Sequence, residues 1–413
     1  MKSKIQNPKS KITIVGAGPA GASLAIRLAE EGFDVCLIER EKFPRHKLCG
    51  EFISPECLAH FKELDVLNEI LESGGERITE TVFYAPSGKS VNVPSKWFNY
   101  QEIGALSLSR AEMDFRLLEK AKQLGVNVLE ETSVIGVLFE NNEVCGVKIK
   151  TKDGNTQEIS SDLTIDGTGR ANVLIKLAEK EISRKDAKTQ RPKSKDQNPK
   201  SKIQNRLVGF KTHLENVALK KGVCEIYFFR GGYGGLSFVE NNLANHCFLI
   251  KAEIVKEFVG NANKIVEEVI FQNKRARETM QNAEPVFDWL AVSVDGFGRK
   301  NLNPARNLFA IGDAAAFIDP FTGSGMLMAL ESAEILAESI SANVFSPQKI
   351  AGHYKIVHKE RFQKRLRVCS LIRRAAFVPN LAKLAISALS LSKTAREVLA
   401  HSTRQRLSAN KNK

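Results

Sequence analysis

Three glycines near the start of the chain have the spacing of a phosphate-binding turn. Gly16, Gly18 and Gly21 directly follow the β-branched run 12–15, and an apolar helical pattern begins among them. The first glycine permits a tight turn, the second lets backbone approach a pyrophosphate, and the third allows close packing of helix on strand. Glu39 ends the next strand pattern, where a carboxylate accepts hydrogen bonds from a ribose. The combination predicts a dinucleotide site at the start of a helix, whose dipole favours phosphate.

A second glycine-rich turn lies in the C-terminal half, after the apolar run 308–311. It begins with Gly312 and Asp313, and continues with Pro320, Gly323, Ser324 and Gly325. A carboxylate at a strand end binds hydroxyl groups, and N–H groups at a helix start bind negative charge. These residues therefore predict a second part of the same site. A helix capped by Gly-Asp, without any ligand, is the alternative that the residues alone leave open.

The order of four motifs along the chain resembles the FAD-dependent flavoprotein hydroxylase (para-hydroxybenzoate hydroxylase-like) superfamily. The motifs are the glycine loop with Glu39 and Arg40, Arg110 with Asp114, Asp166-Gly167-Thr168-Gly169-Arg170, and Gly312-Asp313. The resemblance covers residues 11–345 apart from an insertion. Lys47-Leu48-Cys49-Gly50-Glu51 and the segment 319–325 are similar to the geranylgeranyl reductase-like branch.

The resemblance implies roles for these residues in binding FAD. The glycine loop would bind the ADP half, and Arg110 would lie near the FAD phosphates. Asp166 and Gly167 would contribute to cofactor and NAD(P)H handling, and Asp313 would bind ribityl or ribose hydroxyls. The glycines that follow would line the flavin ring. Because the chain has a single glycine loop of this kind, NAD(P)H is expected to bind transiently as the reductant and then leave.

The reaction itself stays open between several hypotheses. The aromatic-Trp-x-Phe-Pro element of the reductases is replaced here by residues 233–240. The sequence contains no Trp-x-Trp-x-Ile-Pro halogenase element, and its two tryptophans, Trp97 and Trp289, lie apart. The leading hypothesis is reduction of a double bond in a lipophilic isoprenoid-like substrate; polyketide and quinone-like molecules are also considered. The alternative is a flavin monooxygenase that hydroxylates an aromatic or polyketide compound. A third hypothesis, from another class, is a non-catalytic flavin-binding redox sensor.

Three residues are candidates for catalysis, each with a structural alternative. Cys49 would act as a proton donor or orient substrate beside the flavin. In the structural interpretation it is simply a small buried residue. Arg45 would polarise a carbonyl or hold an anion, or it belongs to a solvated charged face. Tyr233 would wall an apolar pocket, or it is ordinary core. No metal site is predicted, because the histidines show no zinc-ligand spacing.

The patterns of strands and helices predict an α/β fold: a Rossmann-type FAD-binding domain with an inserted antiparallel β-rich substrate domain and C-terminal helices. A lysine-rich repeat, Pro-Lys-Ser-Lys, marks two polar segments that lack apolar residues for a core. The predicted divisions are a disordered tail (1–10), the FAD-binding domain (11–75, 105–180 and 298–345), a disordered basic insertion (181–206), the substrate domain (76–104 and 207–297) and a C-terminal helical region (346–413).

The formal net charge of +14 is concentrated in a few segments. Residues 359–413 contain fourteen basic and two acidic residues, and the other basic excess lies in residues 1–11 and 181–206. Such a distribution predicts flexible arms or attraction to an anionic membrane, and no nucleic-acid partner. The C-terminal helices are expected to pack on their own protein, with peripheral membrane contact as the second interpretation.

Seven cysteines without a C-x-x-C pair predict a reduced compartment, so the protein is expected in the cytoplasm, with attachment to the inner face of a membrane as the variant. The basic N-terminus leads into a strand pattern and lacks the apolar core of a signal peptide. The expected partner is a lipophilic small molecule. The sequence leaves open the oligomeric state and the choice between NADH and NADPH.

Overall fold

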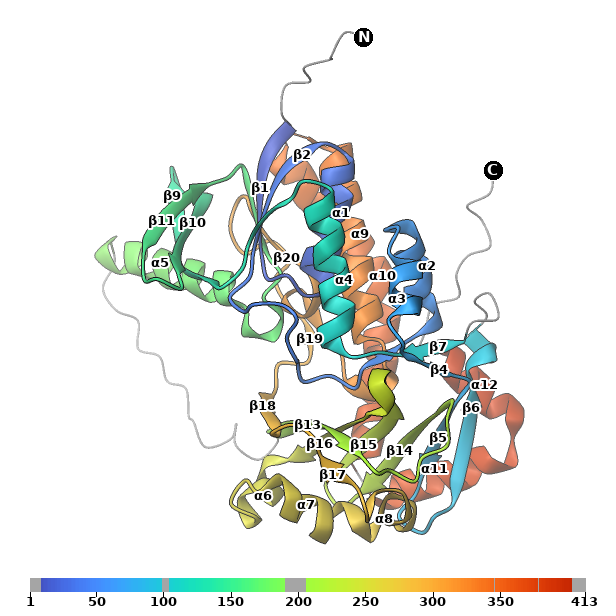
Figure 1. Cartoon of the computed structure of the whole chain (residues 1–413). Helices are drawn as coiled ribbons and strands as arrows, with labels where there is room; N and C mark the ends of the chain where they lie inside the picture. Colours follow the sequence, from blue (N-terminus) through green and yellow to red (C-terminus); the bar gives the residue numbers. More distant parts are fainter. Residues whose placement is uncertain (1–8, 99–103, 190–205, 345, 378, 403–413) are drawn as a thin grey trace.

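A five-stranded parallel sheet forms the centre of the first domain (Figure 1). The computed structural model describes residues 9–98, 104–189, 206–344, 346–377 and 379–402. The sheet has the strand order β20-β12-β1-β2-β8. Its strands are β1 (Lys9–Val15), β2 (Phe33–Ile38), β8 (Asn127–Leu129), β12 (Leu163–Asp166) and β20 (Leu308–Ala310). Strands buried on both faces read as continuous apolar runs, which is why the sequence located β1, β2, β12 and β20.

Helices cover one face of this sheet, and a small antiparallel meander covers the other (Figure 1). The helices are α1 (Pro19–Glu30), α2 (Pro55–Glu63), α3 (Leu67–Glu72), α4 (Arg110–Gln123) and α9 (Gly325–Ala342). The meander consists of β9 (Thr132–Glu140), β10 (Glu143–Thr151) and β11 (Thr156–Ser160), with α5 (Val173–Thr189) against it. Asn141 and Asn142 both have left-handed backbone, which confirms the predicted hairpin turn between β9 and β10.

A second, larger sheet forms the other domain, with the order β17-β13-β16-β15-β14-β5-β6 and β18 paired to β13. Its strands are β5 (Glu80–Tyr84), β6 (Ser90–Pro94), β13 (Leu207–Glu215), β14 (Val223–Phe229), β15 (Gly232–Phe238), β16 (Ala244–Lys251), β17 (Glu284–Pro285) and β18 (Leu290–Val294). All pairs are antiparallel except β14 with β5, which is parallel. Alternation along β14 sends Tyr227 and Phe229 to one face and Phe228 to the other.

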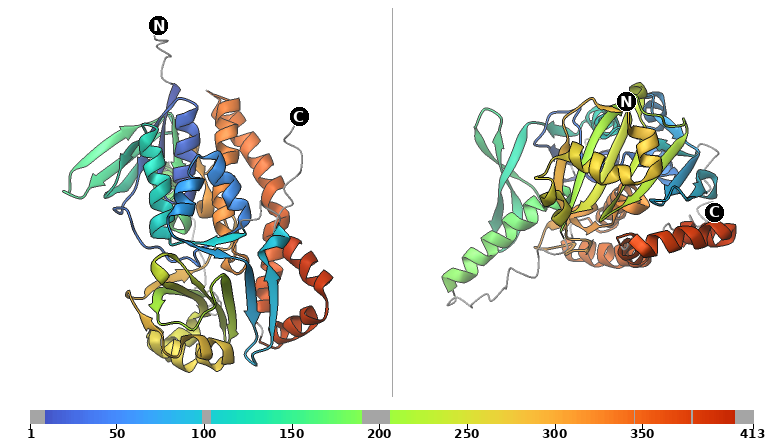
Figure 2. Two further views of the ribbon diagram at one scale, coloured as in Figure 1. Left: turned by 45° about the vertical axis from the view of Figure 1, so that its right-hand side comes forward. Right: turned by 90° about the horizontal axis from the view of Figure 1, so that it is seen from below.

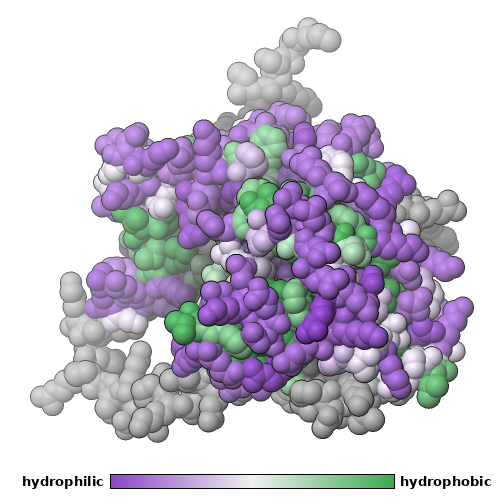
Figure 3. Space-filling view, turned by 60° about the horizontal axis from the view of Figure 1, so that its bottom comes forward, coloured by the Kyte–Doolittle hydropathy of each residue, from purple (hydrophilic) through white to green (hydrophobic). Residues whose placement is uncertain are grey.

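Three short helices cover the outer face of this sheet: α6 (Ala252–Glu257), α7 (Ala262–Glu268) and α8 (Lys274–Met280). The sequence analysis did not predict them, because each has only two turns or fewer and no long apolar stripe. Their outer sides are solvated. Figure 3 shows that this lower face of the molecule is largely hydrophilic, with apolar side chains in separate patches.

Three predicted boundaries need correction. Residues 181–189 belong to helix α5, so they are not part of a disordered insertion; 190–205 lie outside the described residues, as do 1–8. Strand β1 begins at Lys9, inside the predicted tail. Glu76–Ile78 forms β4, which pairs with β7 (Ala105–Ser107) beside β3 (Phe52–Ile53) in a separate three-stranded sheet. These errors arise because lysine-rich composition and short strands carry weak local signals.

The C-terminal region consists of helices α10 (Pro347–Ala376), α11 (Pro379–Leu391) and α12 (Lys393–Ser402). Helix α10 packs on α9, and α11 and α12 pack against β6 at the edge of the second sheet (Figure 2). A short antiparallel pair, β19 (Gly298–Arg299) with β21 (Ala316–Phe317), lies beside the second glycine-rich turn. Among the described residues, no helix combines the length and apolar character needed to cross a membrane.

Close packing of α1 on β1 depends on the absence of a side chain at Gly21. A Cβ atom there would lie 1.9 Å from the carbonyl oxygen of Gly16. We expect Gly21→Ala to lower the free energy of unfolding by about 3 kcal/mol, because backbone has to move to relieve the overlap. Gly352→Ala in α10 is the control, since a Cβ there meets nothing within 4 Å. Urea denaturation measures both variants, and equal stabilities would contradict the packing described for Gly21.

Candidate functional site

A cavity of about 1190 Å³ lies between the two domains and is lined by residues from both sheets and from the C-terminal helices. One end is formed by the two glycine-rich turns and the cationic side chains near them. The other end is formed by apolar side chains of the second sheet, α11 and α12. Most predicted site residues line it. They are Gly16, Gly18, Glu39, Arg40, Arg45, Cys49, Arg110, Gly167, Tyr233, Gly312, Asp313, Pro320, Gly323 and Gly325.

The first glycine loop has the shape of an anion cradle. Gly16 has a φ of +100°, and a Cβ there would lie 2.5 Å from the carbonyl oxygen of Gly167. A Cβ on Gly18 would meet only the Arg110 guanidinium at 3.7 Å, so it would project into the cavity. Gly18 is also the N-cap residue of α1, and no side chain of the described residues caps that helix. The N–H groups of its first turn therefore face the cavity and fit a pyrophosphate.

Glu39 lies at the end of β2, as predicted, and lines the cavity. One carboxylate oxygen accepts a hydrogen bond from the Ala17 backbone N–H at 2.9 Å, and the other accepts from the Glu41 N–H at 3.1 Å. Glu39 thus holds the glycine loop against β2. Each carboxylate oxygen can accept more than one hydrogen bond, so the same group still suits a ribose hydroxyl.

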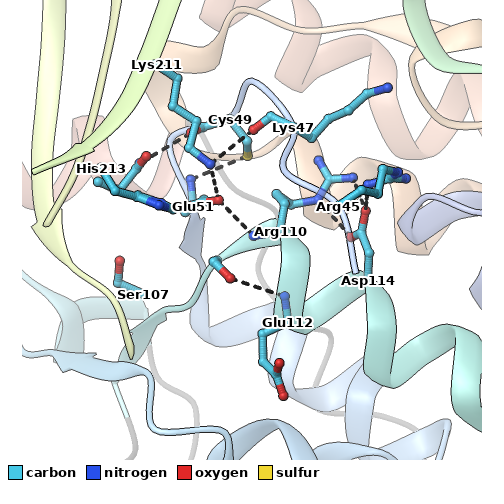
Figure 4. A network of polar contacts seen from close by, with 12 residues as sticks. Arg45, Lys47, Cys49, Glu51, Ser107, Arg110, Glu112, Asp114, Lys211 and His213 are labelled. Carbon is cyan, nitrogen blue, oxygen red and sulfur yellow. Dashed lines mark hydrogen bonds and ion pairs between the residues drawn. The ribbon is translucent and has the colours of Figure 1, made fainter. Parts of the chain in front are cut away.

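One carboxylate fixes two arginines at the end of the cavity that the two glycine-rich turns form (Figure 4). We call this end the phosphate end. Arg110 donates to both oxygens of Asp114 at 2.8 and 2.7 Å, and Arg45 donates to Asp114 at 2.8 Å. Asp114 is fully buried. Burial works to lower the pKa of Arg110, but the charge and hydrogen bonds of Asp114 outweigh it and raise that pKa. The Arg110 guanidinium therefore remains positive beside the place where an anion fits.

Five of the six predicted residues of the second glycine-rich turn line the cavity, and the sixth, Ser324, does not. Asp313 lines the cavity, and no group among the described residues donates a hydrogen bond to its carboxylate. Burial raises its pKa, and the charges of Arg170, Arg110 and Lys300 oppose that rise. A Cβ on Gly325 would meet nothing within 4 Å, so the start of α9 also presents open backbone. Ser324 is buried and does not line the cavity.

Asp166 also lies behind the cavity wall. Its carboxylate accepts hydrogen bonds from the backbone and hydroxyl of Thr168 and from the Ile175 N–H. It is fully buried, and burial raises its pKa against these hydrogen bonds. Asp166 thus shapes the turn that brings Gly167 to the cavity. A direct role of Asp166 in binding the cofactor stays a prediction.

The three candidates for catalysis occupy different parts of the cavity. Arg45 is at the phosphate end, paired with Asp114. Tyr233 is buried, and its hydroxyl donates to Asp319 at 2.6 Å. Burial and the neighbouring Asp319 raise the Tyr233 pKa, so the hydroxyl keeps its proton. Its hydrogen bond to Asp319 then helps to position the 319–325 turn. Cys49 also lines the cavity, and its carbonyl oxygen accepts a hydrogen bond from the Asn245 amide at 3.3 Å. Catalytic roles for all three stay predictions.

The sequence analysis missed a buried polar network around Glu51 (Figure 4). The Glu51 carboxylate accepts hydrogen bonds from the Lys211 ammonium, from His213 Nε2 at 2.7 Å and from the Arg110 backbone N–H at 2.8 Å. Glu51, Lys211 and His213 are all nearly inaccessible to solvent. Lys211 and His213 are alternate residues of β13, so they share one face of the sheet. Two polar residues with this spacing in an apolar strand were the signal that could have revealed the site.

This network keeps a charge inside the protein at the junction of the two domains. Burial raises the pKa of Glu51, but the hydrogen bond from His213 and the charge of Lys211 outweigh it, so the net pKa is lowered. Glu51 also has a left-handed backbone with φ of 54°. Its position in this strained conformation is fixed by the three donors that surround its side chain.

A group of possible metal ligands, His60, Glu63 and Glu334, lies away from the cavity. The Arg27 guanidinium donates to Glu63 at 3.0 Å and lies 3.4 Å from His60 Nδ1. Because an arginine already neutralises these groups, they provide no reason to infer a bound metal.

Comparisons with known proteins place this architecture among flavin enzymes. Residues 9–346 match the sequence family described as FAD binding domain. The chain is 26% identical over 361 residues to digeranylgeranylglycerophospholipid reductase 1 of Methanococcoides burtonii, covering 83% of this chain and 78% of that protein. It is also 26% identical over 380 residues to the flavin-dependent halogenase armH4 of Armillaria mellea, covering 83% and 67%.

Solved structures with the same fold belong to both kinds of enzyme. A geranylgeranyl bacteriochlorophyll reductase-like protein from Thermoplasma acidophilum aligns with a TM-score of 0.75 at 18% identity, covering 95% of this chain and 96% of that chain. The flavin-dependent brominase Bmp2 aligns with a TM-score of 0.70 at 18% identity, covering 95% and 93%. At such identities these structures show a shared fold alone.

Replacing Lys211 tests how much the ion pair between Glu51 and Lys211 contributes to the free energy of unfolding. We expect Lys211→Met to lower the free energy of unfolding by about 3 kcal/mol at neutral pH, because it leaves the buried Glu51 carboxylate without its cation. The double variant with Glu51→Gln should recover most of this loss. Urea denaturation measures the free energy of unfolding of the parent, the single variant and the double variant. A Lys211→Met variant as stable as the parent would refute the contribution of the Glu51–Lys211 pair.

The pH dependence of this stabilisation has a definite sign. Because the folded pKa of Glu51 is lowered, its contribution is present above the ordinary glutamate pKa of about 4.3 and is lost as pH falls through the lower folded value. The free energy of unfolding of the parent, measured by urea denaturation relative to that of the double variant Lys211→Met, Glu51→Gln, should therefore fall on acidification below about pH 4.

Proposed function

We propose that this chain, which belongs to the FAD binding domain family, uses NAD(P)H to reduce a carbon–carbon double bond in a long isoprenoid-like lipid. Family membership confirms FAD as the cofactor and the resemblance that the motifs predicted, and the relatives include both geranylgeranyl-type reductases and halogenases. The protein is therefore an FAD-dependent oxidoreductase. The choice of reaction and of substrate is the proposal.

The residues at the phosphate end fit FAD. Gly16, Gly18 and the start of α1 would hold the pyrophosphate together with Arg110, and Glu39 would bind the adenosine ribose. Asp313 would accept hydrogen bonds from the ribityl chain, and the turn that contains Gly323 and Gly325 would face the flavin ring. Bound FAD supplies hydride chemistry, taking a hydride from NAD(P)H and passing it to substrate. The chain's own residues bind, orient and exclude water.

The observation that carries the proposal is the apolar far end of the cavity. Its walls come from β5, β6, β14, α11 and α12, and include Phe83, Val91, Val93, Ile226, Phe228, Ile386 and Leu389. Ligand pockets usually measure about 300–1,000 Å³, so this cavity has room for a substrate beside a dinucleotide. Apolar walls of this extent match a hydrocarbon chain better than a single aromatic ring, which supports reduction over aromatic hydroxylation.

Between the two ends lies a small polar group that can position a double bond and supply a proton. Cys49 and Glu51 line the cavity here, and the Glu51 backbone N–H donates to Cys49 Sγ at 3.4 Å. Reduction of an alkene needs one proton for each hydride. Among nearby thiols, burial raises the pKa of Cys247 and Cys224 to about 12, which makes them poor proton donors. Cys49 is therefore the thiol that we assign to this role.

The proposal is tested by product analysis without oxygen. The purified protein with FAD and NADPH, or NADH, is incubated anaerobically with a geranylgeranyl lipid, and the products are analysed by mass spectrometry. We expect the lipid to gain two hydrogen atoms for each reduced bond. Products that form only in air and carry an added oxygen atom would establish the monooxygenase. Failure of both nicotinamides to bleach the flavin with any substrate would instead support a redox sensor.

Gly18 offers a test of the FAD site that is separate from folding. We expect Gly18→Val to abolish FAD retention, because the new side chain would occupy the space against the pyrophosphate. The apoprotein should keep its thermal unfolding temperature, since the side chain enters the cavity and not the core. Flavin absorbance after gel filtration reports retention, and a yellow Gly18→Val protein would overturn the assignment.

A further inference from the structure

We propose that the C-terminal helix pair α11–α12 docks on an anionic lipid bilayer and forms the wall past which a lipid chain enters the cavity. The inference rests on the proposed function, because it names the place from which a lipophilic substrate reaches that site. The occupant of this face is a membrane with negatively charged headgroups.

The outer side of the pair exposes large apolar side chains. Leu391, at the end of α11, is 88% exposed, and Val398 of α12 is 64% exposed. Ala395 lies one turn before Val398 on the same side of α12 and is also exposed. Exposure of a single apolar residue is ordinary, but several exposed apolar residues close to basic residues on two consecutive helices are typical of an interfacial surface.

The inner side of α12 forms part of the cavity wall. Arg396, Leu399 and Ala400 line the cavity, together with Ile386 and Leu389 of α11. Arg396 and Val398 are two residues apart, which separates them by about 200° around the helix. Helix α12 therefore has one side toward the cavity and the opposite side toward solvent, so a lipid needs to pass only one helix to leave a bilayer and enter the site.

A polar contact holds α12 in this position. The Arg396 guanidinium donates to the carbonyl and the side-chain oxygen of Asn92 in β6, at 3.3 and 2.8 Å. Its guanidinium carbon also lies 5.9 Å from the centre of the Trp97 ring. These contacts are at the exposed edge of the second sheet, where Figure 2 shows α11 and α12 along its outside.

Charge complementarity identifies the bilayer as anionic. Residues 379–413, which begin with α11 and α12, contain seven basic residues and one acidic residue, and Lys393 begins α12 with its side chain exposed. Basic residues near a membrane surface are attracted to acidic headgroups, and apolar side chains beside them insert at the interface.

Vesicle sedimentation tests the docking face. The holoenzyme is mixed with vesicles of phosphatidylglycerol or of phosphatidylcholine at low salt. We expect binding to the former and little to the latter. The double variant Leu391→Glu, Val398→Glu should bind phosphatidylglycerol vesicles on the order of 100-fold more weakly, because two apolar side chains are replaced by charges. Ile356→Glu is the matched control: Ile356 is 60% exposed, but it lies in α10 roughly 30 Å before the end of that helix.

Activity measurements separate this inference from the proposed reaction. With a short prenyl alcohol in solution, the double variant should turn over as the parent does, since neither Leu391 nor Val398 lines the cavity. With a geranylgeranyl lipid embedded in vesicles, it should lose most of its activity. Equal vesicle binding by the parent and the double variant would overturn the docking face. Normal vesicle binding without turnover of any prenyl substrate would overturn the proposed function and leave the docking face standing.

Discussion

The cavity depends on one buried carboxylate that joins the two domains. Glu51 belongs to the loop after β2 of the first domain, and its partners Lys211 and His213 belong to β13 of the second. Lys211 also donates to the carbonyl oxygen of Lys47, so a single ammonium group ties that loop to the sheet at two points. A charge so deeply buried is stable only with its partners in place. The domains are therefore held at a fixed separation, and the space between them keeps its shape.

That fixed space is divided by the chemistry of its walls. At one end, Asp114 holds Arg45 and Arg110, which keeps two cations close together despite their mutual repulsion. At the other, aromatic and branched side chains such as Phe83 and Phe228 leave few groups for water to bind. A polar ligand with an anionic centre and an apolar ligand can thus occupy one cavity end to end. Ligands in the two ends would meet where the ends join, which is where we propose that Cys49 acts.

The sequence revealed what local patterns encode and missed what distant segments build together. The turns at Gly16–Gly21 and Gly312–Asp313 each lie within a few residues of a strand end, so their spacing alone located them. In the sequence, Glu51 is an ordinary acidic residue after Cys-Gly. Its role is seen only in the structure, where Lys211 of β13, 160 residues away, donates to its carboxylate. The same reason applies to Glu76–Ile78, whose pairing with β7 crosses the predicted domain boundary. The roles of such residues depend on contacts between segments far apart in the chain. A local stretch of sequence carries no information about these contacts.

The C-terminal helices are part of the cavity, although the family match ends at residue 346. Asp319, in the turn that precedes α9, accepts hydrogen bonds from the Tyr233 hydroxyl and the Phe321 N–H, and Arg373 of α10 lies 3.8 Å from its other oxygen. The Arg373 guanidinium also stacks on Phe297 at 4.3 Å. Helix α10 is thereby fixed to the second glycine-rich turn, and it carries α11 and α12 to the apolar end of the cavity. Strands β5, β6 and β14 of the matched region form part of that end, and α11 and α12, which lie beyond the match, complete it. Family membership therefore determines the cofactor, whereas the walls that a substrate would meet include residues outside the family match.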